Sequence, residues 1–233
     1  NTLRKGRSRV IERNHVVILG WSEQVFTVIS ELAEANRSNK DAVIVILCDR
    51  DPVEMEDSIN SRIPDKKNSR VICRQGNTSL MSDFEIVSLD LARAIIVLSQ
   101  DDDDSETIKT LLAILNNPHR KKAPYHIVAE IRDPGNLQVA KLIDKDNEVE
   151  LLMVGDFIAR IIAQTCRQPG LSLIYTELLD FEKNEIYFIP AGQTAGSSFG
   201  EAISTFENSS VIGFIGQDNV PHLNPPMDTP IGP

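Results

Sequence analysis

The sequence predicts an α/β fold in which helices cover both faces of a doubly wound parallel sheet. Short apolar segments of strand length alternate along the chain with segments whose apolar residues recur at helical spacing. The strand segments carry apolar residues on both faces, and such strands occur in parallel sheets that are buried on both faces. We therefore expect a Rossmann-type domain, followed by a helical hairpin and a small α+β lobe.

The first strand–helix–strand unit sets this pattern. A strand over residues 15–19 leads into a glycine turn, a helix over 23–36 and a strand over 42–48. Units of this kind bind nucleotides at the turn, and an acid after the second strand bonds the ribose. If NAD or ATP binds, we expect Gly20, Trp21 and Ser22 at the phosphates and Asp49 at the ribose.

The dinucleotide fingerprint is incomplete in this turn. That fingerprint requires three glycines, and Ser22 and Val25 occupy the second and third positions. Both side chains would hinder the approach of a pyrophosphate, so the sequence keeps the scaffold while disfavouring the nucleotide.

The alternation continues to residue 154. Further strands are predicted over residues 69–74, 94–98, 126–131 and 149–154, and further helices over 52–60, 79–87, 105–115 and 134–143.

A helical hairpin follows the sixth strand. Helices over 155–168 and 171–179 are separated by Pro169 and Gly170, and their apolar surface exceeds what one edge of a sheet can cover. We interpret the hairpin as a dimerisation element; the alternative is that it packs on the lobe that follows. The expected contact residues are Phe157, Ile161, Leu171, Ile174 and Leu178.

The pattern changes after the hairpin. Strands over 185–189 and 211–215 and a helix over 198–206 predict a small α+β lobe. The proline-rich residues 222–233 should lead into further strand pairing, so this lobe is expected to be truncated.

Composition limits the partners and the chemistry. The net charge of −10 argues against nucleic acid or an anionic membrane surface as a direct partner. The three cysteines lie in apolar runs and are expected to be reduced core residues of a cytosol-like compartment. Hydrolase, metalloprotease and thiol-triad motifs are missing, so we predict that the chain is not an enzyme.

The first residues are basic. Residues 1–13 contain a single acid, whereas their basic residues are Arg4, Lys5, Arg7, Arg9 and Arg13. The segment is either a solvated linker or a connector next to a membrane span, where basic residues concentrate on the cytoplasmic side.

An acidic run follows the fourth strand. Asp101, Asp102, Asp103 and Asp104 stand where strand order should reverse, and Asp49 and Asp133 are expected at the same sheet edge. Carboxylates repel phosphate but supply the oxygens that Ca²⁺ prefers. The hypothesis is a regulatory Ca²⁺ site formed by the run with Asp49 or Asp133. The alternative is that the run caps the next helix.

Several segments resemble the cytosolic regions of Castor/Pollux-type cation channels. The resemblance rests on residues 5–22, which include the Gly-Trp-Ser turn, on 71–76 and 92–98, and on the Gln-Pro-Gly-Leu sequence at 168–171. It extends to about Phe181 and is looser beyond. A prokaryotic homologue is one possibility that the resemblance leaves open.

This resemblance implies an RCK domain, related to TrkA-type regulators, on the cytosolic face of a membrane. Residues 1–14 would be the connector from the protein's own transmembrane pore domain, 15–154 the Rossmann lobe, 155–180 the crossover and 181–233 the C-terminal lobe. The family implies a homo-oligomer in which dimers build a tetrameric or octameric gating ring. Two alternatives remain: a nucleotide-binding subunit of a TrkA-type potassium uptake system and a dehydrogenase fragment.

Overall fold

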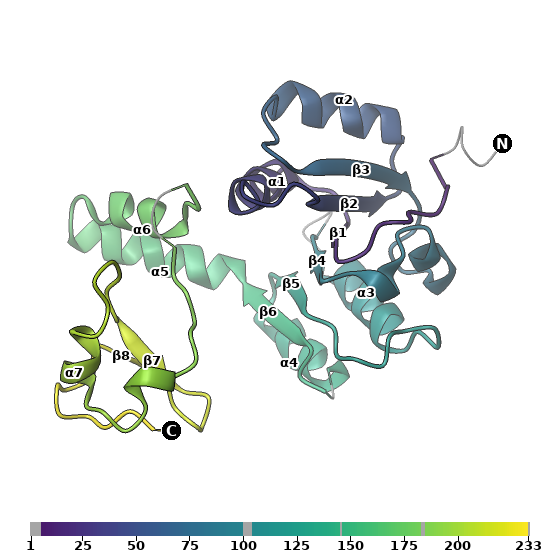
Figure 1. Ribbon diagram of the computed structural model, residues 1–233. Coiled ribbons are helices and arrows are strands. Elements are labelled where there is room, and N and C mark those ends of the chain that lie inside the picture. Colours follow the sequence, from purple (N-terminus) through teal and green to yellow (C-terminus); the bar gives the residue numbers. More distant parts are fainter. Residues whose placement is uncertain (1–5, 100–103, 145, 183–184, 233) are drawn as a thin grey trace. The chain divides into compact units, whose positions relative to one another are not determined.

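The computed structural model describes residues 6–99, 104–144, 146–182 and 185–232. The chain divides into two compact units, Asn1–Glu185 and Ile186–Pro233. Unit 1 contains a six-stranded sheet and unit 2 a two-stranded sheet (Figure 1).

The elements of unit 1 have the following bounds. The strands are β1 (Val16–Leu19), β2 (Val43–Cys48), β3 (Arg70–Gln75), β4 (Ala94–Val97), β5 (Ile127–Ile131) and β6 (Val149–Met153). The helices are α1 (Gln24–Ala35), α2 (Pro52–Arg62), α3 (Ser105–Leu115), α4 (Pro134–Ile143), α5 (Val154–Arg167) and α6 (Leu171–Leu179), and the 3₁₀ turns are η2 (Met81–Glu85) and η3 (Leu89–Leu91).

The sheet is parallel throughout, with the strand order β3-β2-β1-β4-β5-β6. The direction of winding reverses between β1 and β4, where Val16 pairs with Ile44 on one side and Ala94 on the other. This order confirms the predicted doubly wound α/β sheet.

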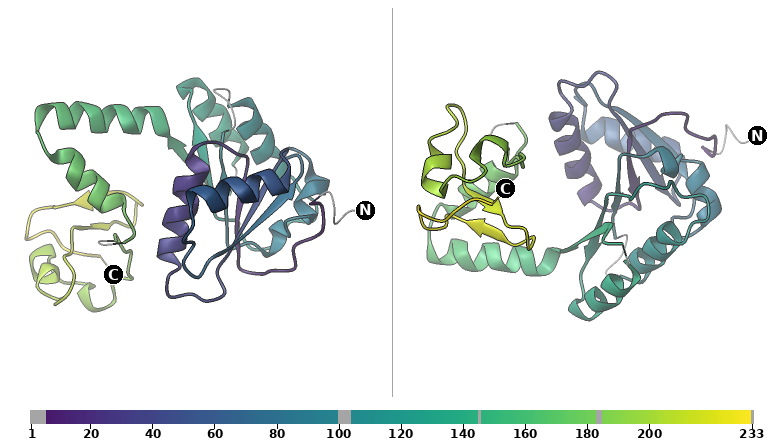
Figure 2. Two further views of the ribbon diagram at one scale, coloured as in Figure 1. Left: turned by 90° about the horizontal axis from the view of Figure 1, so that it is seen from above. Right: turned by 60° about the horizontal axis from the view of Figure 1, so that its bottom comes forward.

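Two apolar clusters fill the two faces of the sheet. Successive residues of β1 and β2 point to opposite faces, so Val17 and Leu19 enter one cluster and Ile18 enters the other. Helices α1 and α2 cover the face of Ile18 through Val25, Ile29, Met55 and Ile59. Helix α3 and the η2–η3 segment cover the opposite face, and Figure 2 shows the helices on the two sides of the sheet.

Residues 6–14, called the strap below, lie against unit 1. Val10 is only 2% exposed and joins the cluster on the α3 face, and its amide donates to the carbonyl of Ile86 at 2.7 Å. The described part of the basic lead-in is therefore docked on the lobe, and the interpretation as a solvated linker is wrong for these residues.

Two predicted elements are missing or much shorter in the structure. The helix expected over 79–87 is only the short 3₁₀ turn η2, because the chain reverses at Ser88, whose φ is 46°. The strand expected over 185–189 is absent among the described residues, since β7 (Gly213–Ile215) pairs only with β8 (Pro221–Leu223). β8 lies at the start of the proline-rich end, so strand pairing does occur there.

The rest of unit 2 is small. It adds η4 (Gly192–Thr194) and α7 (Phe199–Ile203), which is shorter than the predicted helix over 198–206. Ser198 and Glu201 form a capping box at the start of α7, and this box fixes where the helix begins.

The cysteines divide into two groups. Cys48 and Cys73 are fully buried, as predicted, and burial raises the pKa of Cys48 to about 11 and that of Cys73 to about 12. Cys166 is exposed on α5, so the expectation that it is a core residue is wrong for this chain. None of the described residues of α5 is buried, so Cys166 lies on a helix that adds nothing to the core.

His15 connects the strap to β1 and is 1% exposed. Its Nε2 lies 2.8 Å from the carbonyl oxygen of Val87, which can only accept, so Nε2 carries the proton. Its buried Nδ1 has no partner among the described residues. Burial lowers the pKa of His15, against the opposing effects of that hydrogen bond and of the charges of Glu12 and Asp90.

We expect the chain to lose stability on acidification below the unfolded-state pKa of about 6.5. There the unfolded chain binds a proton that folded His15 resists, so the free energy of unfolding falls by up to ~1.4 kcal/mol per pH unit until the lower folded pKa is reached. Denaturant unfolding between pH 7.5 and 5.0 measures this slope. His15→Gln should flatten it, while the same change at exposed His119 should not; equal slopes in both variants would contradict the assignment.

Candidate functional site

The candidate site lies at the carboxyl edge of the large sheet, where ligands of doubly wound folds sit outside the point of strand reversal. The segments there follow β1, β4, β2 and β5 in the chain. Each contributes polar residues that the sequence singled out, and each is positioned by the strand before it.

The turn after β1 has the shape expected of a nucleotide-binding loop but a filled interior. Gly20 has a φ of 100°, and its amide donates to Leu47 at 2.9 Å. Trp21 is 6% exposed, its ring makes an edge contact with Phe26 at 5.5 Å, and the Arg50 guanidinium lies 5.7 Å from it. The indole is thus packed into the protein.

Ser22 and Val25 complete this turn. Val25 is fully buried against the sheet, where the fingerprint requires glycine. The hydroxyl of Ser22 is buried and has no hydrogen-bond partner among the described residues. A ligand bound at this turn could supply that partner.

The predicted metal ligands are distributed along the edge. Asp49 is exposed after β2, and Asp133 is exposed after β5. One oxygen of Asp133 already caps α4 by accepting from the amide of Gly135 at 2.8 Å. Asp101, Asp102 and Asp103 lie outside the described residues. Within the described ranges, His, Cys, Asp and Glu side chains form no group of three that could hold a metal ion.

Asp104 is only 2% exposed and serves the neighbouring loop. Its carboxylate accepts from the amides of Arg132 and Asp133, both at 2.9 Å, and from the Asn136 side chain at 3.1 Å. It makes no side-chain cap on α3, so the alternative that it caps its own helix is wrong. Asp104 instead fixes the turn between β5 and α4.

Glu130 is a carboxylate that the sequence analysis did not select. It is 6% exposed on β5; one oxygen accepts from Nε of Arg132 at 3.1 Å, and the other has no partner among the described residues. The signal was present as a single acid inside an otherwise apolar strand. Such a residue has a structural or ligand-binding partner far more often than an exposed acid does.

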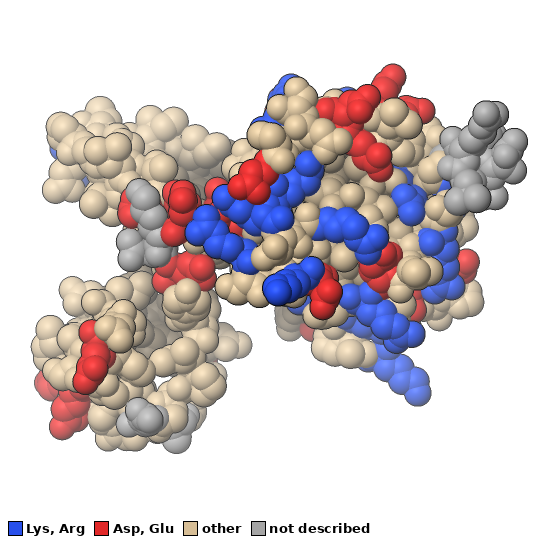
Figure 3. Space-filling view, turned by 45° about the horizontal axis from the view of Figure 1, so that its top comes forward, with Lys and Arg blue, Asp and Glu red and all other residues tan. Residues whose placement is uncertain are grey.

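Charge is uneven over the surface. Figure 3 shows that lysines and arginines gather on one face of unit 1, although the chain as a whole carries a charge of −10. The net charge alone therefore does not describe the distribution of charge on this face of unit 1.

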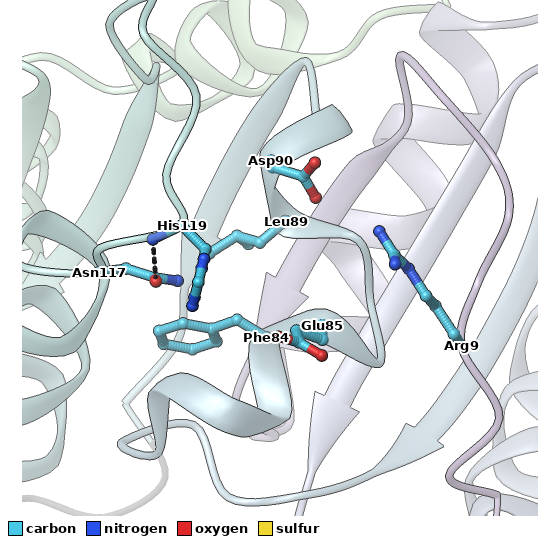
Figure 4. Close-up of a pocket in the computed structure, with 7 residues that line it drawn as sticks. All are labelled: Arg9, Phe84, Glu85, Leu89, Asp90, Asn117 and His119. Atoms are coloured by element: carbon cyan, nitrogen blue, oxygen red, sulfur yellow. Dashed lines mark hydrogen bonds between the residues drawn. The ribbon is translucent and has the colours of Figure 1, made fainter.

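A cavity of about 230 Å³ lies on unit 1 and is bordered by the strap (Figure 4). Arg9 of the strap and Asp90 of η3 form charged parts of the lining, Phe84 and Leu89 form apolar parts, and Asn117 accepts from the amide of His119 at 2.9 Å. Ligand pockets are usually larger, ~300–1,000 Å³. The cavity is therefore better explained by loose packing of the strap on unit 1 than by a binding site for a small molecule.

The hairpin of α5 and α6 exposes its apolar residues. Phe157 is 56% exposed, Ile174 55% and Leu178 44%, whereas Ile161 and Leu171 are half-buried. Neither helix has a buried residue among those described. None of the described helices has the length and apolar character needed to cross a membrane.

Two family models match the chain. One, described as "Castor and Pollux, part of voltage-gated ion channel", matches residues 155–233. The other, described as "Calcium-activated potassium channel slowpoke-like RCK domain", matches residues 12–127. Together they match parts of both units and leave residues 1–11 and 128–154 unmatched.

Full-length relatives agree with these models. The probable ion channel POLLUX of Arabidopsis thaliana is 35% identical over 98% of this chain, and the ion channel CASTOR of Lotus japonicus is 36% identical over 88% of it. The chain belongs to the Castor/Pollux family. It spans only 28% and 24% of those two relatives.

More distant proteins share the RCK fold of this Castor/Pollux domain. The calcium-gated potassium channel TvoK of Thermoplasma volcanium is 27% identical over 90% of this chain and 57% of its own length. The human SLO3 gating ring superposes with a TM-score of 0.59 at 18% identity, over 94% of this chain and 42% of that one. These relatives are channels or channel domains, not enzymes, which confirms the prediction that this Castor/Pollux domain is not an enzyme.

Replacing Asp104 should destabilise unit 1 strongly. Asp104→Ala removes a buried acceptor from two amides and one side chain, so we expect a loss of ~2–4 kcal/mol in the free energy of unfolding. Urea unfolding measures it. Asp133→Ala, which removes an exposed helix cap, is the matched control and should cost about 1 kcal/mol. Equal losses would show that Asp104 does not hold the turn.

Proposed function

We propose that this chain is a ligand-sensing RCK domain at the cytosolic face of a membrane, where it gates the pore of a cation channel, and that Ca²⁺ is its effector. The observation that carries the proposal is the family relationship to Castor and Pollux over nearly the whole chain. The name of the TvoK relative, a calcium-gated potassium channel, favours Ca²⁺ among possible effectors.

The proposed cation site is at the carboxyl edge. Asp101, Asp102 and Asp103 would supply oxygens together with Asp49 or Asp133, which are exposed after β2 and after β5 respectively. Asp104 positions the β5–α4 turn beside them. Glu130 adds a buried carboxylate oxygen without a partner among the described residues, and a hard cation prefers such ligands.

Assembly is the second part of the proposal. The exposed apolar hairpin of α5 and α6 would pair with the hairpin of another copy, and dimers would build a tetrameric or octameric ring under the pore domain. Residues 1–14 would connect that pore to unit 1, with 155–180 as the crossover and 181–233 as the C-terminal lobe. Effector binding would act by favouring one arrangement of the ring over another.

A nucleotide is the alternative effector, as in a TrkA-type potassium uptake subunit. Gly20 has the backbone geometry of a phosphate-binding turn, and the buried hydroxyl of Ser22 lacks a partner among the described residues. The packing of Trp21 and Val25 in the same turn weighs against NAD or ATP.

Calorimetric titration of the purified chain with CaCl₂, NAD⁺ and ATP tests these proposals, with mass followed by light scattering. We expect calcium heat and a change in assembly. Replacing Asp101, Asp102 and Asp103 by asparagine while keeping Asp104 should abolish the calcium heat without unfolding the chain.

The control changes three acids elsewhere: Asp57, Asp65 and Asp218 to asparagine. They are exposed and belong to none of the loops that directly follow β1, β2, β4 and β5, so calcium binding should persist. Nucleotide heat without calcium heat would replace the proposal by the TrkA-type alternative, and Ser22→Val should then abolish it.

A further inference from the structure

The strap crosses unit 1 from one edge of the sheet to the other. Its residues form no helix or strand, yet its backbone is hydrogen-bonded to the lobe along its whole described length. Where the chain enters unit 1 therefore depends on whether the strap is docked.

The first end of the strap is at the carboxyl edge. The carbonyl of Gly6 accepts from the amide of Gln75, the last residue of β3, at 3.1 Å. Gly6 has a φ of 60°, and a Cβ on it would collide with the ring of Pro52, which begins α2 immediately after the loop of Asp49. Only glycine combines this backbone conformation with so close an approach.

The second end is at the amino edge. The amide of Asn14 donates to Leu91 at 2.9 Å, and the carbonyl of His15 accepts from Arg93, just before β4, at 2.8 Å. The two ends are thus separated by about the length of β3, roughly 20 Å for a strand of this size.

Two side chains of unit 1 hold the strap between these ends. Asp83, whose side chain is 7% exposed, accepts from Arg7 at 2.5 Å and from the amide of Asn77 at 2.9 Å. Ser88, 1% exposed, donates to the carbonyl of Val10 at 2.6 Å and accepts from Nε of Arg9 at 3.1 Å.

The strap supplies the contacts that offset the backbone strain of Ser88 and the buried charge of Asp83. Ser88 keeps a left-handed φ of 46°, which a residue other than glycine rarely adopts. Asp83 is a buried carboxylate whose charged partner comes from the strap alone among the described residues. Each would lose its main partners if the strap left.

The packing on either side of the strap is open. The cavity of about 230 Å³ has Arg9 in its wall, and a second cavity of about 380 Å³ is lined by Glu12 and Arg13. The strap is therefore held by discrete polar contacts and by Val10 rather than by continuous close packing.

We propose that Arg7, Asp83 and Ser88 are positioning residues that move the attachment point of the preceding chain from the amino edge to the carboxyl edge of the sheet. With the strap docked, Gly6, the first described residue, lies at the carboxyl edge in contact with the α2 start that follows the candidate ligand Asp49. With the strap released, the preceding chain would meet unit 1 at His15, a strand length away.

The consequence of this inference for gating rests on the proposed function. A connector attached at the carboxyl edge moves with the loop after β2, so a change at Asp49 reaches the preceding chain through Pro52 and Gly6. The docking itself needs neither an effector nor a pore.

Spin labels on the chain test the docking. Cys166→Ser removes the exposed thiol, and the buried Cys48 and Cys73 remain. Labels at Ser8→Cys and Lys40→Cys then report the distance from the strap to the amino-edge loop before β2. We expect one narrow distance population and an immobilised label at position 8 in the parent chain.

Arg7→Gln and Asp83→Asn should each broaden that population, mobilise the label and speed amide exchange at Val10 and Asn14. Arg13→Gln is the matched control, because Arg13 is an exposed arginine of the same strap with no hydrogen bond or ion pair to other described residues.

A broad distribution in the parent chain, or equal behaviour of the Arg7 and Arg13 variants, would overturn the proposal. Arg7→Gln changes a side chain that is 40% exposed, so it remains informative if the change at buried Asp83 prevents folding. Failure of this test would leave the calcium proposal standing, and failure of the calcium titration would leave the docked strap standing.

Discussion

Burial of the central strands on both faces is the constraint on which unit 1 depends. All residues of β1 are buried, so neither face of the sheet can be left to solvent. Helices α1 and α2 cover one face over β1, β2 and β3, but the crossover from β3 to β4 provides only η2 and η3 instead of a full helix. Val10 of the strap therefore joins Phe84, Val87 and Leu89 in covering the other face. Through Val10 the strap contributes one residue to the core, although it lies before the first strand.

Local pattern was sufficient for the sheet and insufficient wherever a distant partner decides the structure. The strands and the helices of unit 1 follow from apolar spacing, with ends displaced by a few residues at most. Residues 185–189 have strand composition, but a strand also needs a neighbour, and β7 and β8 pair with each other. The segment 79–87 has helical spacing, but Ser88 takes a left-handed conformation to reach the strap, and this contact spans more than seventy residues of sequence. Neither the missing strand neighbour of residues 185–189 nor the contact between Ser88 and the strap can be identified from the local sequence.

The same limit separates the acids of the carboxyl edge. In sequence Asp104 is the last of four similar aspartates, and only the fold reveals that its oxygens are hydrogen-bonded to a turn 28 residues later. No cluster of acids marks Glu130 in the sequence, because its neighbours are apolar. An acid in a buried strand nevertheless carries a desolvation cost that a partner must offset. Burial is thus a better guide than clustering: it identifies Asp104 as structural and Glu130 as incompletely satisfied.

A modest cation site is sufficient for the proposed gating. Reversing a two-state equilibrium from 1:99 to 99:1 requires a differential affinity of ~10⁴-fold. If four copies switch together, each site needs only the fourth root of that factor, roughly tenfold or about 1.4 kcal/mol. Exposed carboxylates, which bind cations with little desolvation, can supply a difference of that size. The harder requirement is transmission, because a preference of this size is lost if the connector moves independently of the edge where the ligand binds. The contact between Gly6 and Pro52 meets that requirement among the described residues, because it joins the strap directly to the start of α2, which follows the loop after β2.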